Sequence, residues 1–203
     1  MTRIKLCGLS RPCDIEAANK LKPEYVGFVF ASGSRRYVSP KRAAMLKKLL
    51  APGIMAVGVF VREDPQVIAG LLEEGMIDMA QLHGGESEED IRKLRKLTDK
   101  SIIQAVRIDG ESDIVRAKRS SGDFILLDSG SGGSGMAFDW RLAKKLERPY
   151  FLAGGLGADN VVLAVRILCP YGVDVSSGIE TGGVKDESKM AAFVAAVRKE
   201  EQI

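Results

Sequence analysis

Short apolar runs alternate with longer amphipathic segments along the whole chain. The runs are rich in β-branched residues and bounded by Gly, Pro or polar residues, a pattern typical of buried strands in a parallel sheet. Eight strands are predicted, at Ile4–Cys7, Tyr25–Phe30, Met55–Phe60, Met79–His83, Ile102–Val106, Phe124–Asp128, Tyr150–Ala153 and Val173–Val175. The remaining segments predict eight helices, at Pro12–Leu21, Pro40–Leu50, Pro65–Glu74, Glu86–Leu97, Glu111–Arg119, Asp139–Lys145, Ala158–Leu168 and Glu187–Lys199.

Eight strands alternating with eight helices, roughly 25 residues apart, indicate an α/β protein with a single (β/α)8 TIM barrel near its minimum length. A doubly wound open sheet is the alternative, although it more usually has five or six strands. The stretch Ser129–Gly135 has the composition of a linker. It directly follows Asp128, at the end of a strand, and precedes the next helix. We therefore interpret it as a mobile active-site loop rather than a domain boundary, and predict one catalytic domain over residues 1–203.

The composition is that of a soluble globular protein, with 45% hydrophobic and 28% charged residues in a chain of 203. A formal charge of +3, from 30 basic and 27 acidic residues, argues against a nucleic-acid partner, because such proteins usually carry a basic stripe. No segment has the roughly 20 apolar residues of a membrane helix. No long apolar stretch follows the N-terminal MTRIKLCGLS, so neither membrane association nor a signal peptide is expected.

Histidine and cysteine are too sparse for a predicted metal centre. The chain has one histidine, His83, and three scattered cysteines, Cys7, Cys13 and Cys169, without the spacing of zinc ligands. An odd number of cysteines fits a reducing compartment better than a disulfide framework. We therefore expect a cytoplasmic, metal-free protein, in which Cys13 and Cys169 serve as packing residues.

The working face of a (β/α)8 barrel is the C-terminal end of its strands. Side chains alternate between the two faces of a strand. We therefore expect the apolar Ile4 and Leu6 to contact the outer helices, and Lys5 and Cys7 to point into the barrel. By the same alternation, Asp128 lies on the inner face of its strand. A thiol and a carboxyl at opposite sides of the barrel mouth have the chemistry of a base and an acid for proton transfer.

Each of these two groups has an alternative interpretation. Cys7 acts as a base only as a thiolate, which a nearby cation such as Lys5 favours. Considered alone, Cys7 also fits an inert, buried residue, as free cysteines often are. An inert, buried role is not an option for Asp128, because a carboxylate that ends an apolar strand has to be solvated, paired or functional.

Two loops rich in glycine and serine indicate a phosphate site. Gly154-Gly155 follow the seventh predicted strand and Ser176-Ser177-Gly178 follow the eighth. These two loops most often bind phosphate in this fold, through backbone N–H groups and the N-terminus of a short helix. A Gly-Gly pair alone usually marks a turn. The two loops together predict a small phosphorylated ligand.

Arg35 and Arg36 follow the second predicted strand. We interpret one of them as solvated surface charge, whereas an arginine at the barrel mouth is a natural bidentate partner for a carboxylate. His83, at the end of the fourth predicted strand, is interpreted as a structural or loop-anchoring residue rather than a catalytic one.

Seven segments together resemble the phosphoribosylanthranilate isomerase family of tryptophan biosynthesis. They run in order from Ile4 to Asp186 and read IKLCGLSRPCDI, YVGFVFASGSRRYVSP, VGVFV, QLHGGE, ILLDSGSGGSGMAFDW, LAGGLGADNV and GVDVSSGIETGGVKD. A short piece such as GGL is weak evidence, but the combination is very specific. The resemblance covers nearly the whole chain.

The resemblance implies an Amadori rearrangement of N-(5′-phosphoribosyl)anthranilate to 1-(2-carboxyphenylamino)-1-deoxyribulose 5-phosphate, without cofactor or metal. It implies that Asp128 is the general acid on the ring oxygen and that Cys7 is the general base at carbon two of the sugar. Arg36 is implied near the anthranilate carboxylate. The phosphate is implied at Gly154, Gly155, Ser176, Ser177 and Gly178. Family members of this length favour a monomer, with a homodimer as the alternative.

The chain departs from the family at three places. Ser32-Gly33 stand where family members often carry proline and a polar residue, Gly182 stands where proline is common, and Cys13 has no expected counterpart. These differences concern the rigidity of loops, and with it turnover, rather than the acid, the base or the arginine.

Three rival functions share the barrel. A histidine-pathway ProFAR isomerase performs the same chemistry with two aspartates, and Cys7 argues against it. An indole-glycerol-phosphate synthase needs lysine and glutamate at the barrel mouth and is normally longer. An inactive sugar-phosphate-binding barrel keeps the phosphate loops but has lost the acid or the base, whereas this chain has both.

Overall fold

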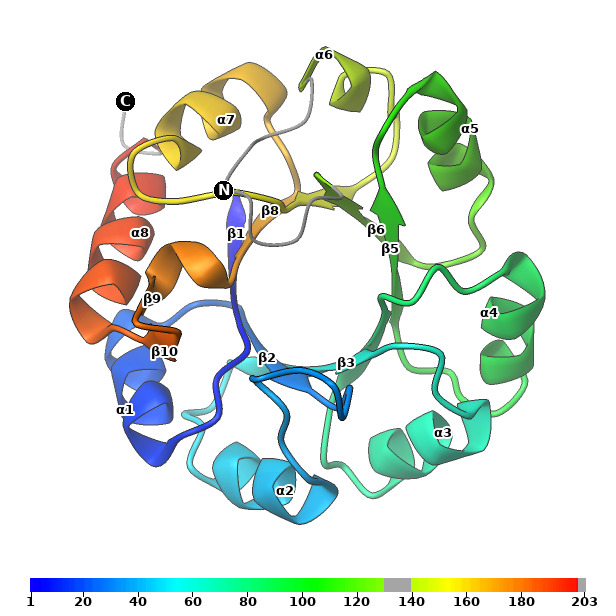
Figure 1. Ribbon diagram of the computed structural model, residues 1–203, viewed down its shortest axis with the longest axis horizontal. Helices are drawn as coiled ribbons and strands as arrows, with labels where there is room; N and C mark the ends of the chain where they lie inside the picture. Colours follow the sequence, from blue (N-terminus) through cyan, green and yellow to red (C-terminus); the bar gives the residue numbers. More distant parts are fainter. Residues whose placement is uncertain (130–139, 201–203) are drawn as a thin grey trace.

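A closed barrel of eight parallel strands forms the centre of the computed structural model, which describes residues 1–129 and 140–200 (Figure 1). The strands are β1 (Arg3–Cys7), β2 (Tyr25–Val29), β3 (Met55–Phe60), β4 (Met79–Leu82), β5 (Ile102–Arg107), β6 (Phe124–Asp128), β7 (Tyr150–Leu152) and β8 (Gly172–Val175). Pairing of β8 with β1, from Arg3 opposite Gly172 to Leu6 opposite Val175, closes the barrel. The predicted (β/α)8 barrel is confirmed, and the open sheet is excluded.

A ring of helices surrounds the strands (Figure 1). They are α1 (Pro12–Leu21), α2 (Pro40–Lys48), α3 (Pro65–Glu73), α4 (Glu88–Arg95), α5 (Glu111–Arg119), α6 (Trp140–Ala143), α7 (Val161–Leu168) and α8 (Glu187–Glu200). Helix α4 begins two residues later than predicted, because Ser87 and Asp90 cap it through reciprocal side-chain and backbone hydrogen bonds. The expected first residue of α6, Asp139, lies outside the described residues. Within the described part of the chain, no helix is long and apolar enough to cross a membrane.

The alternation of side chains divides the core into an outer and an inner part. Outward residues such as Ile4 and Leu6 are fully buried beneath the helices, as predicted. Inward residues of β2 to β7 fill the bottom of the barrel with a second apolar cluster, made of Tyr25, Val57, Met79, Ile103, Leu126 and Phe151, and Ala153 joins this cluster from just after β7. Each large apolar side chain buried in this way stabilises the fold by about 1.5–3 kcal/mol. The bottom of the barrel is therefore a packed core, and a cavity can form only at its mouth.

A buried ion pair lies inside the barrel between β1 and β8. Lys5 Nζ is 2.8 Å from Asp174 Oδ1, and the two side chains are 0% and 8% exposed. Burial by itself lowers the pKa of Lys5, but the charge and hydrogen bond of Asp174 raise it above its usual value. Lys5 is therefore cationic at neutral pH, and its favourable contribution to stability is lost only as the pH rises through that raised pKa.

Removing one partner of this pair is expected to destabilise the protein strongly. In Asp174→Ala the ammonium group of Lys5 stays buried without its counter-ion, which costs about 3–5 kcal/mol of unfolding free energy. In Lys5→Met/Asp174→Leu both charges are replaced by apolar groups, and we expect most of that loss to be recovered. Urea unfolding of the three proteins at neutral pH measures both effects. A loss below about 1 kcal/mol in Asp174→Ala would contradict the assignment of a strong buried pair.

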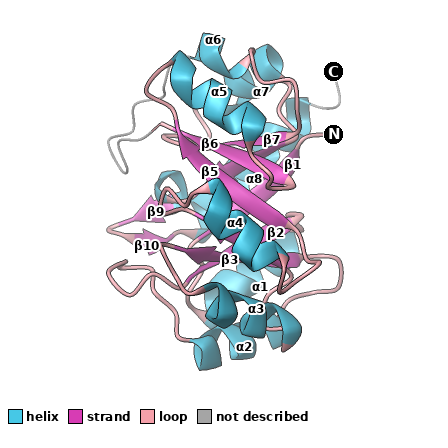
Figure 2. Cartoon of the chain, turned by 90° about the vertical axis from the view of Figure 1, so that its right-hand side faces the viewer, coloured by secondary structure: helices cyan, strands magenta, loops and turns pink. Residues whose placement is uncertain are grey.

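Two short elements after β8 were not predicted from the sequence. They are a 3-10 turn, η1 (Ser177–Ile179), and a hairpin of β9 (Glu180–Thr181) and β10 (Val184–Lys185) (Figure 2). Gly182 and Gly183 form the hairpin turn with φ of 58° and 82°, a backbone conformation that favours glycine. Proline cannot adopt a positive φ, so the departure from the family at Gly182 accompanies a tight turn.

Candidate active site

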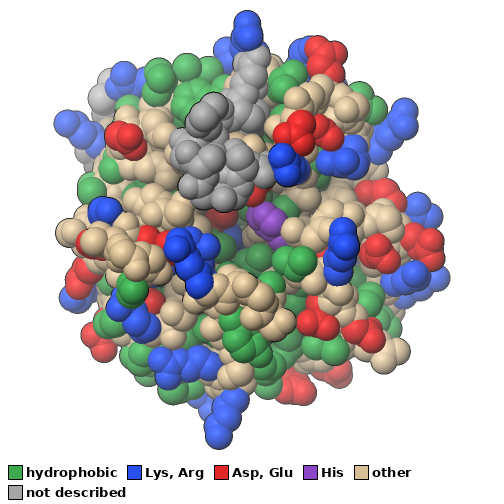
Figure 3. Space-filling model, viewed as in Figure 1, with side chains coloured by type: hydrophobic (Ala, Val, Ile, Leu, Met, Phe, Trp, Pro, Cys, Tyr) green, Lys and Arg blue, Asp and Glu red, His purple; other side chains and the backbone are tan. Residues whose placement is uncertain are grey.

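A cavity of about 760 Å³ opens at the C-terminal mouth of the barrel, which is a usual size for a small-molecule site. Its opening lies at the centre of the face in Figure 3, where the single histidine is visible in the wall. The lining includes seven residues proposed from the sequence, namely Cys7, Arg36, Asp128, Gly154, Gly155, Ser176 and Ser177. The eighth, Gly178, lines a smaller adjoining cavity together with Gly155 and Ser177.

Cys7 ends β1 with its side chain inside the barrel and 7% of the residue exposed. The neighbouring strand provides room for the sulfur, because a Cβ at Gly27 would lie 2.7 Å from Cys7 Sγ. Burial raises the pKa of the Cys7 thiol, and the carboxylate of Asp174 raises it further. Lys5 and Lys185 act in the opposite direction but do not offset burial. The expected thiolate-favouring effect of Lys5 is therefore present, but it is outweighed in the substrate-free protein.

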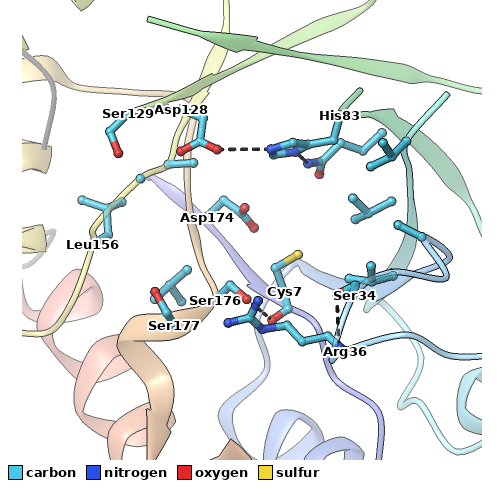
Figure 4. A pocket seen from close by; sticks show the side chains of 18 of the residues that line it. Cys7, Ser34, Arg36, His83, Asp128, Ser129, Leu156, Asp174, Ser176 and Ser177 are labelled. Atoms are coloured by element: carbon cyan, nitrogen blue, oxygen red, sulfur yellow. Dashed lines mark hydrogen bonds and ion pairs between the residues drawn. The ribbon is translucent and has the colours of Figure 1, made fainter. Parts of the chain in front are cut away.

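Asp128 ends β6, on the side of the cavity opposite Arg36 (Figure 4). Its Oδ2 is 3.1 Å from His83 Nε2, and Gln81 Nε2 is 2.7 Å from His83 Nδ1. Burial by itself raises the pKa of Asp128, but the hydrogen bond from His83 and the backbone N–H of Ser129 are among the interactions that bring it below its usual value. His83, which the sequence analysis interprets as a structural or loop-anchoring residue, lines the cavity and is the hydrogen-bond partner of Asp128.

Arg36 is fixed by a carboxylate of the hairpin. Its Nε and Nη2 donate to Glu180 Oε1 and Oε2 at 2.6 and 2.9 Å. Arg35 and Lys185 also donate to Glu180, at 2.8 and 2.7 Å. Burial by itself raises the pKa of Glu180, but the hydrogen bonds of Arg36 and Lys185 lower it to about 2. One carboxylate thus holds three cationic side chains at one edge of the cavity, and the group as a whole is positive.

The two predicted phosphate loops approach each other closely. Gly154 and Gly155 have φ of 83° and 65°, and a Cβ at Gly178 would lie 2.0 Å from the carbonyl oxygen of Leu156. Only glycine allows this contact between the two backbones. Asn160 ties the first loop together, because its side chain donates to Gly155 O and accepts from Gly157 N, both at 2.9 Å.

The second loop is joined to β1 and to the hairpin. Ser176 Oγ donates to the carbonyl oxygen of Cys7 at 3.2 Å. Lys185 Nζ donates to Ser176 O at 2.8 Å and lies 3.2 Å from Ser176 Oγ. The loop, the position of Cys7 and the cationic group around Glu180 therefore form one connected structure.

Sequence reasoning missed four polar residues of this site, namely Gln81, Asp174, Glu180 and Lys185. Alternation along β4 and β8 provides a signal for the first two, since both lie on the inward face of their strands. The short hairpin gave no comparable signal for Glu180 and Lys185. Within residues 1–129 and 140–200, no group of three or more His, Cys, Asp or Glu side chains lies close enough to hold a metal ion.

The other two cysteines are not packing residues, and that prediction was wrong. Cys13 lies on α1 and Cys169 caps the C-terminal end of α7, and both are exposed. Cys169 has φ of 44°, and this left-handed cap ends α7 before the chain enters β8.

The three thiols are expected to react at very different rates. Cys13 and Cys169 are exposed, whereas Cys7 is buried and its pKa is raised, so Cys7 has less thiolate and less access. With a chromogenic disulfide reagent at neutral pH, two thiols should react quickly and the third at least about 100-fold more slowly. The variant Cys13→Ser/Cys169→Ser should retain only the slow phase. A fast single thiol in that variant would contradict the burial of Cys7.

Comparison with known proteins gives a consistent result. The family model described as N-(5′phosphoribosyl)anthranilate (PRA) isomerase matches residues 4–196. The N-(5′-phosphoribosyl)anthranilate isomerase of Endomicrobium trichonymphae is 44% identical over 202 residues, which cover 98% of this chain and 99% of the relative. The crystal structure of phosphoribosyl anthranilate isomerase from Thermus thermophilus is similar, with a TM-score of 0.88 at 34% identity over 98% of this chain and 99% of that one.

A third similar protein was solved with a ligand. It is a phosphoribosyl anthranilate isomerase in complex with reduced 1-(o-carboxyphenylamino)-1-deoxyribulose 5-phosphate, with a TM-score of 0.86 at 34% identity. The match covers 98% of this chain and 100% of that one. The family match over residues 4–196 and the near-complete coverage of these relatives show that this chain belongs to the N-(5′-phosphoribosyl)anthranilate isomerase family.

Proposed function

We propose that this protein converts N-(5′-phosphoribosyl)anthranilate to 1-(2-carboxyphenylamino)-1-deoxyribulose 5-phosphate, with Asp128 as general acid and Cys7 as general base. One observation carries the assignment of the pair. A carboxyl from β6 and a thiol from β1 line the same cavity, which also includes both glycine- and serine-rich loops. Proton donor, proton acceptor and phosphate site are thereby within reach of one small ligand.

The reaction needs two proton transfers in sequence. Protonated Asp128 donates to the furanose ring oxygen while the bond between that oxygen and carbon one breaks, which leaves a Schiff base to the anthranilate nitrogen. The thiolate of Cys7 then takes the proton from carbon two, and the electrons of that C–H bond form the carbon–carbon double bond of an enolamine. Tautomerisation of the enolamine gives the ketone. Atoms are conserved, and each transfer is general acid or base catalysis.

The charges of the cavity suit a ligand with two anionic groups. We assign the anthranilate carboxylate to Arg36, whose guanidinium is oriented by Glu180. We assign the phosphate to Gly154, Gly155, Ser176, Ser177 and Gly178, where backbone N–H groups of tight loops are available. The three cations that share Glu180 leave an excess of positive charge near both anions. Anchoring at two ends would place the sugar between Cys7 and Asp128.

The acid, the base, Arg36 and both loops line cavities of a single chain, so the proposed chemistry uses no residue of a second copy. We propose a monomer, in which residues 1–203 act as one catalytic domain in the cytoplasm without cofactor.

The decisive test is a steady-state assay on freshly generated phosphoribosylanthranilate, in which loss of substrate fluorescence reports turnover. The histidine-pathway substrate serves as the comparison. We expect saturable turnover of phosphoribosylanthranilate and at most a small fraction of that kcat/KM with the other substrate. Absence of turnover, with the fold verified by circular dichroism, would refute the proposed function. Equal efficiency on both substrates would refute the specificity.

A further inference from the structure

His83 takes no part in the two proton transfers, yet it lies in the cavity beside the general acid (Figure 4). It follows β4, whose residue Gln81 is only 1% exposed. Gln81 and His83 are two positions apart, so they share the inward face of this strand. Their side chains form a chain of hydrogen bonds that ends at Asp128 Oδ2.

The chain of hydrogen bonds defines the tautomer of His83. At neutral pH the carboxylate of Asp128 is only an acceptor, so the Nε2 of His83 that faces it carries a proton, and the bare Nδ1 accepts from the amide of Gln81 at 2.7 Å. A neutral imidazole then has its proton on Nε2. That N–H points at Asp128 Oδ2 at 3.1 Å and donates to it.

We propose that His83 is the positioning residue of the general acid: its Nε2–H binds Oδ2 of Asp128, so that the proton to be transferred is carried on Oδ1. In a carboxylic acid the carbonyl oxygen is the better acceptor, so a donor fixed at Oδ2 favours protonation of the other oxygen. Gln81 supports this arrangement by fixing the tautomer. The inference rests on the proposed function, because it assigns His83 a role through Asp128.

Other charged groups also act on Asp128 and have to be distinguished from His83. Arg107 at the end of β5 lies beside Asp128 in the sheet register and lowers the pKa of its carboxyl. Arg107 is itself paired with Asp109 at 2.9 Å. Cys7 from β1 and Asp174 from β8 line the same cavity. None of these groups donates a side-chain hydrogen bond to Asp128 among the described residues, whereas His83 does.

A positioning role and a purely electrostatic role of His83 predict opposite changes in kcat when His83 is replaced. The hydrogen bond of His83 opposes the effect of burial and lowers the pKa of Asp128. Without it the protonated form of the acid is more abundant at neutral pH, so a purely electrostatic role predicts a variant at least as fast as the wild type. A positioning role predicts a slower variant, because the proton-bearing oxygen is no longer fixed.

The test compares His83→Leu, which removes the donor, with His83→Gln, whose amide keeps an N–H of similar reach. We expect kcat to fall about 10- to 100-fold in His83→Leu with KM changed less than about threefold, and His83→Gln to recover most of kcat. The low-pH limb of kcat/KM should move to higher pH in His83→Leu and return in His83→Gln. Unchanged kcat in His83→Leu, or equal damage in both variants, would overturn the proposal.

A measurement without turnover separates this inference from the proposed function. The chain has a single histidine, so long-range ¹H–¹⁵N spectra of tag-free protein report the tautomer of His83 directly. We expect a protonated Nε2 and a bare Nδ1 in the wild type, and a mixture of tautomers in Gln81→Met. A protonated Nδ1 in the wild type would overturn the inference even if the enzyme is active. The expected tautomer in a protein that does not turn over phosphoribosylanthranilate would refute only the proposed function.

Discussion

Asp128→Asn is expected to lower kcat by about 10²- to 10⁴-fold, the range usually lost with a general acid. Asparagine has the same shape, and its amide oxygen still accepts the hydrogen bond from His83. It has no transferable proton, so the ring oxygen would leave as an unstabilised anion. Substrate binding should change little, because the anionic groups of the substrate are assigned to Arg36 and the phosphate loops.

The fold of Asp128→Asn is expected to be intact. Because the pKa of Asp128 is lowered in the folded state, its carboxylate stabilises the protein above the unfolded-state pKa, and this contribution is lost as the pH falls through the folded-state value. The amide keeps one hydrogen bond, so the unfolding free energy at neutral pH should drop by no more than about 1–2 kcal/mol. Turnover and urea unfolding measured on the same samples separate the two effects.

A matched control is available at the other end of the barrel. Asp99 lies between α4 and β5, on the side away from the mouth, and is exposed. Asp99→Asn makes the same chemical change and should leave kcat and KM within about twofold of the wild type. Near-wild-type turnover by Asp128→Asn would mean that another group, or water, protonates the ring oxygen.

The barrel and the positions of Cys7 and Asp128 could be predicted because they depend on local patterns. Strand alternation places Cys7 inward at the end of β1 and Asp128 inward at the end of β6. Strand ends in this fold share one face. The alternation of side chains along a single strand was therefore enough to predict that each of these two side chains points into the barrel. No contact between distant segments had to be known.

The partners of these residues could not be predicted in the same way. Glu180 meets Arg36 across a sequence separation of 144 residues, and it does so from a hairpin of two-residue strands. His83 meets Asp128 across β5, which separates their two strands, and this requires a strongly curved sheet. Such contacts depend on the curvature of the sheet, whereas an apolar pattern reports only which face of a strand is buried.

The direction of the pKa shift of Cys7 could not be predicted from the sequence either, because it depends on the balance between two opposing effects. Lys5 was expected to favour the thiolate of Cys7, and it does act in that direction. Its charge is already paired with Asp174, however, and burial of the thiol outweighs it. The sign of the pKa shift depends on how completely the sulfur is removed from water, which is a property of the assembled barrel.

Cys7→Ser is expected to reduce kcat by about 10²- to 10⁴-fold, because a hydroxyl is a far weaker base than a thiolate and cannot take the proton from carbon two. Cys13→Ser and Cys169→Ser are the matched controls. Both replace exposed thiols away from the cavity and should retain full activity. Wild-type turnover by Cys7→Ser would remove Cys7 from the mechanism and leave it as a packed residue at the end of β1.

The pH dependence of kcat/KM of the wild type follows from the pKa shifts of Cys7 and Asp128. Burial raises the pKa of Cys7, and the partners of Asp128 lower the pKa of its carboxyl against the effect of burial. The substrate-free protein near neutral pH therefore holds a thiol and a carboxylate. The reactive pair, a thiolate and a carboxylic acid, contains the same number of protons. Its share of the protein is therefore constant between the two pKa values.

We accordingly expect kcat/KM to be flat through the neutral range, apart from the titration of the substrate phosphate near about pH 6. It should fall below the lowered pKa of Asp128, where both groups carry protons, and above the raised pKa of Cys7, where neither does. Even ordinary pKa values of about 8.5 and 3.9 make the reactive pair on the order of 10⁻⁵ of the protein, at a cost of about 6 kcal/mol. Binding of the phosphate and the carboxylate has to offset that cost. A profile with an additional acidic limb centred near about pH 7, lost in Cys7→Ser, would show instead that much of Cys7 is thiolate before substrate binds.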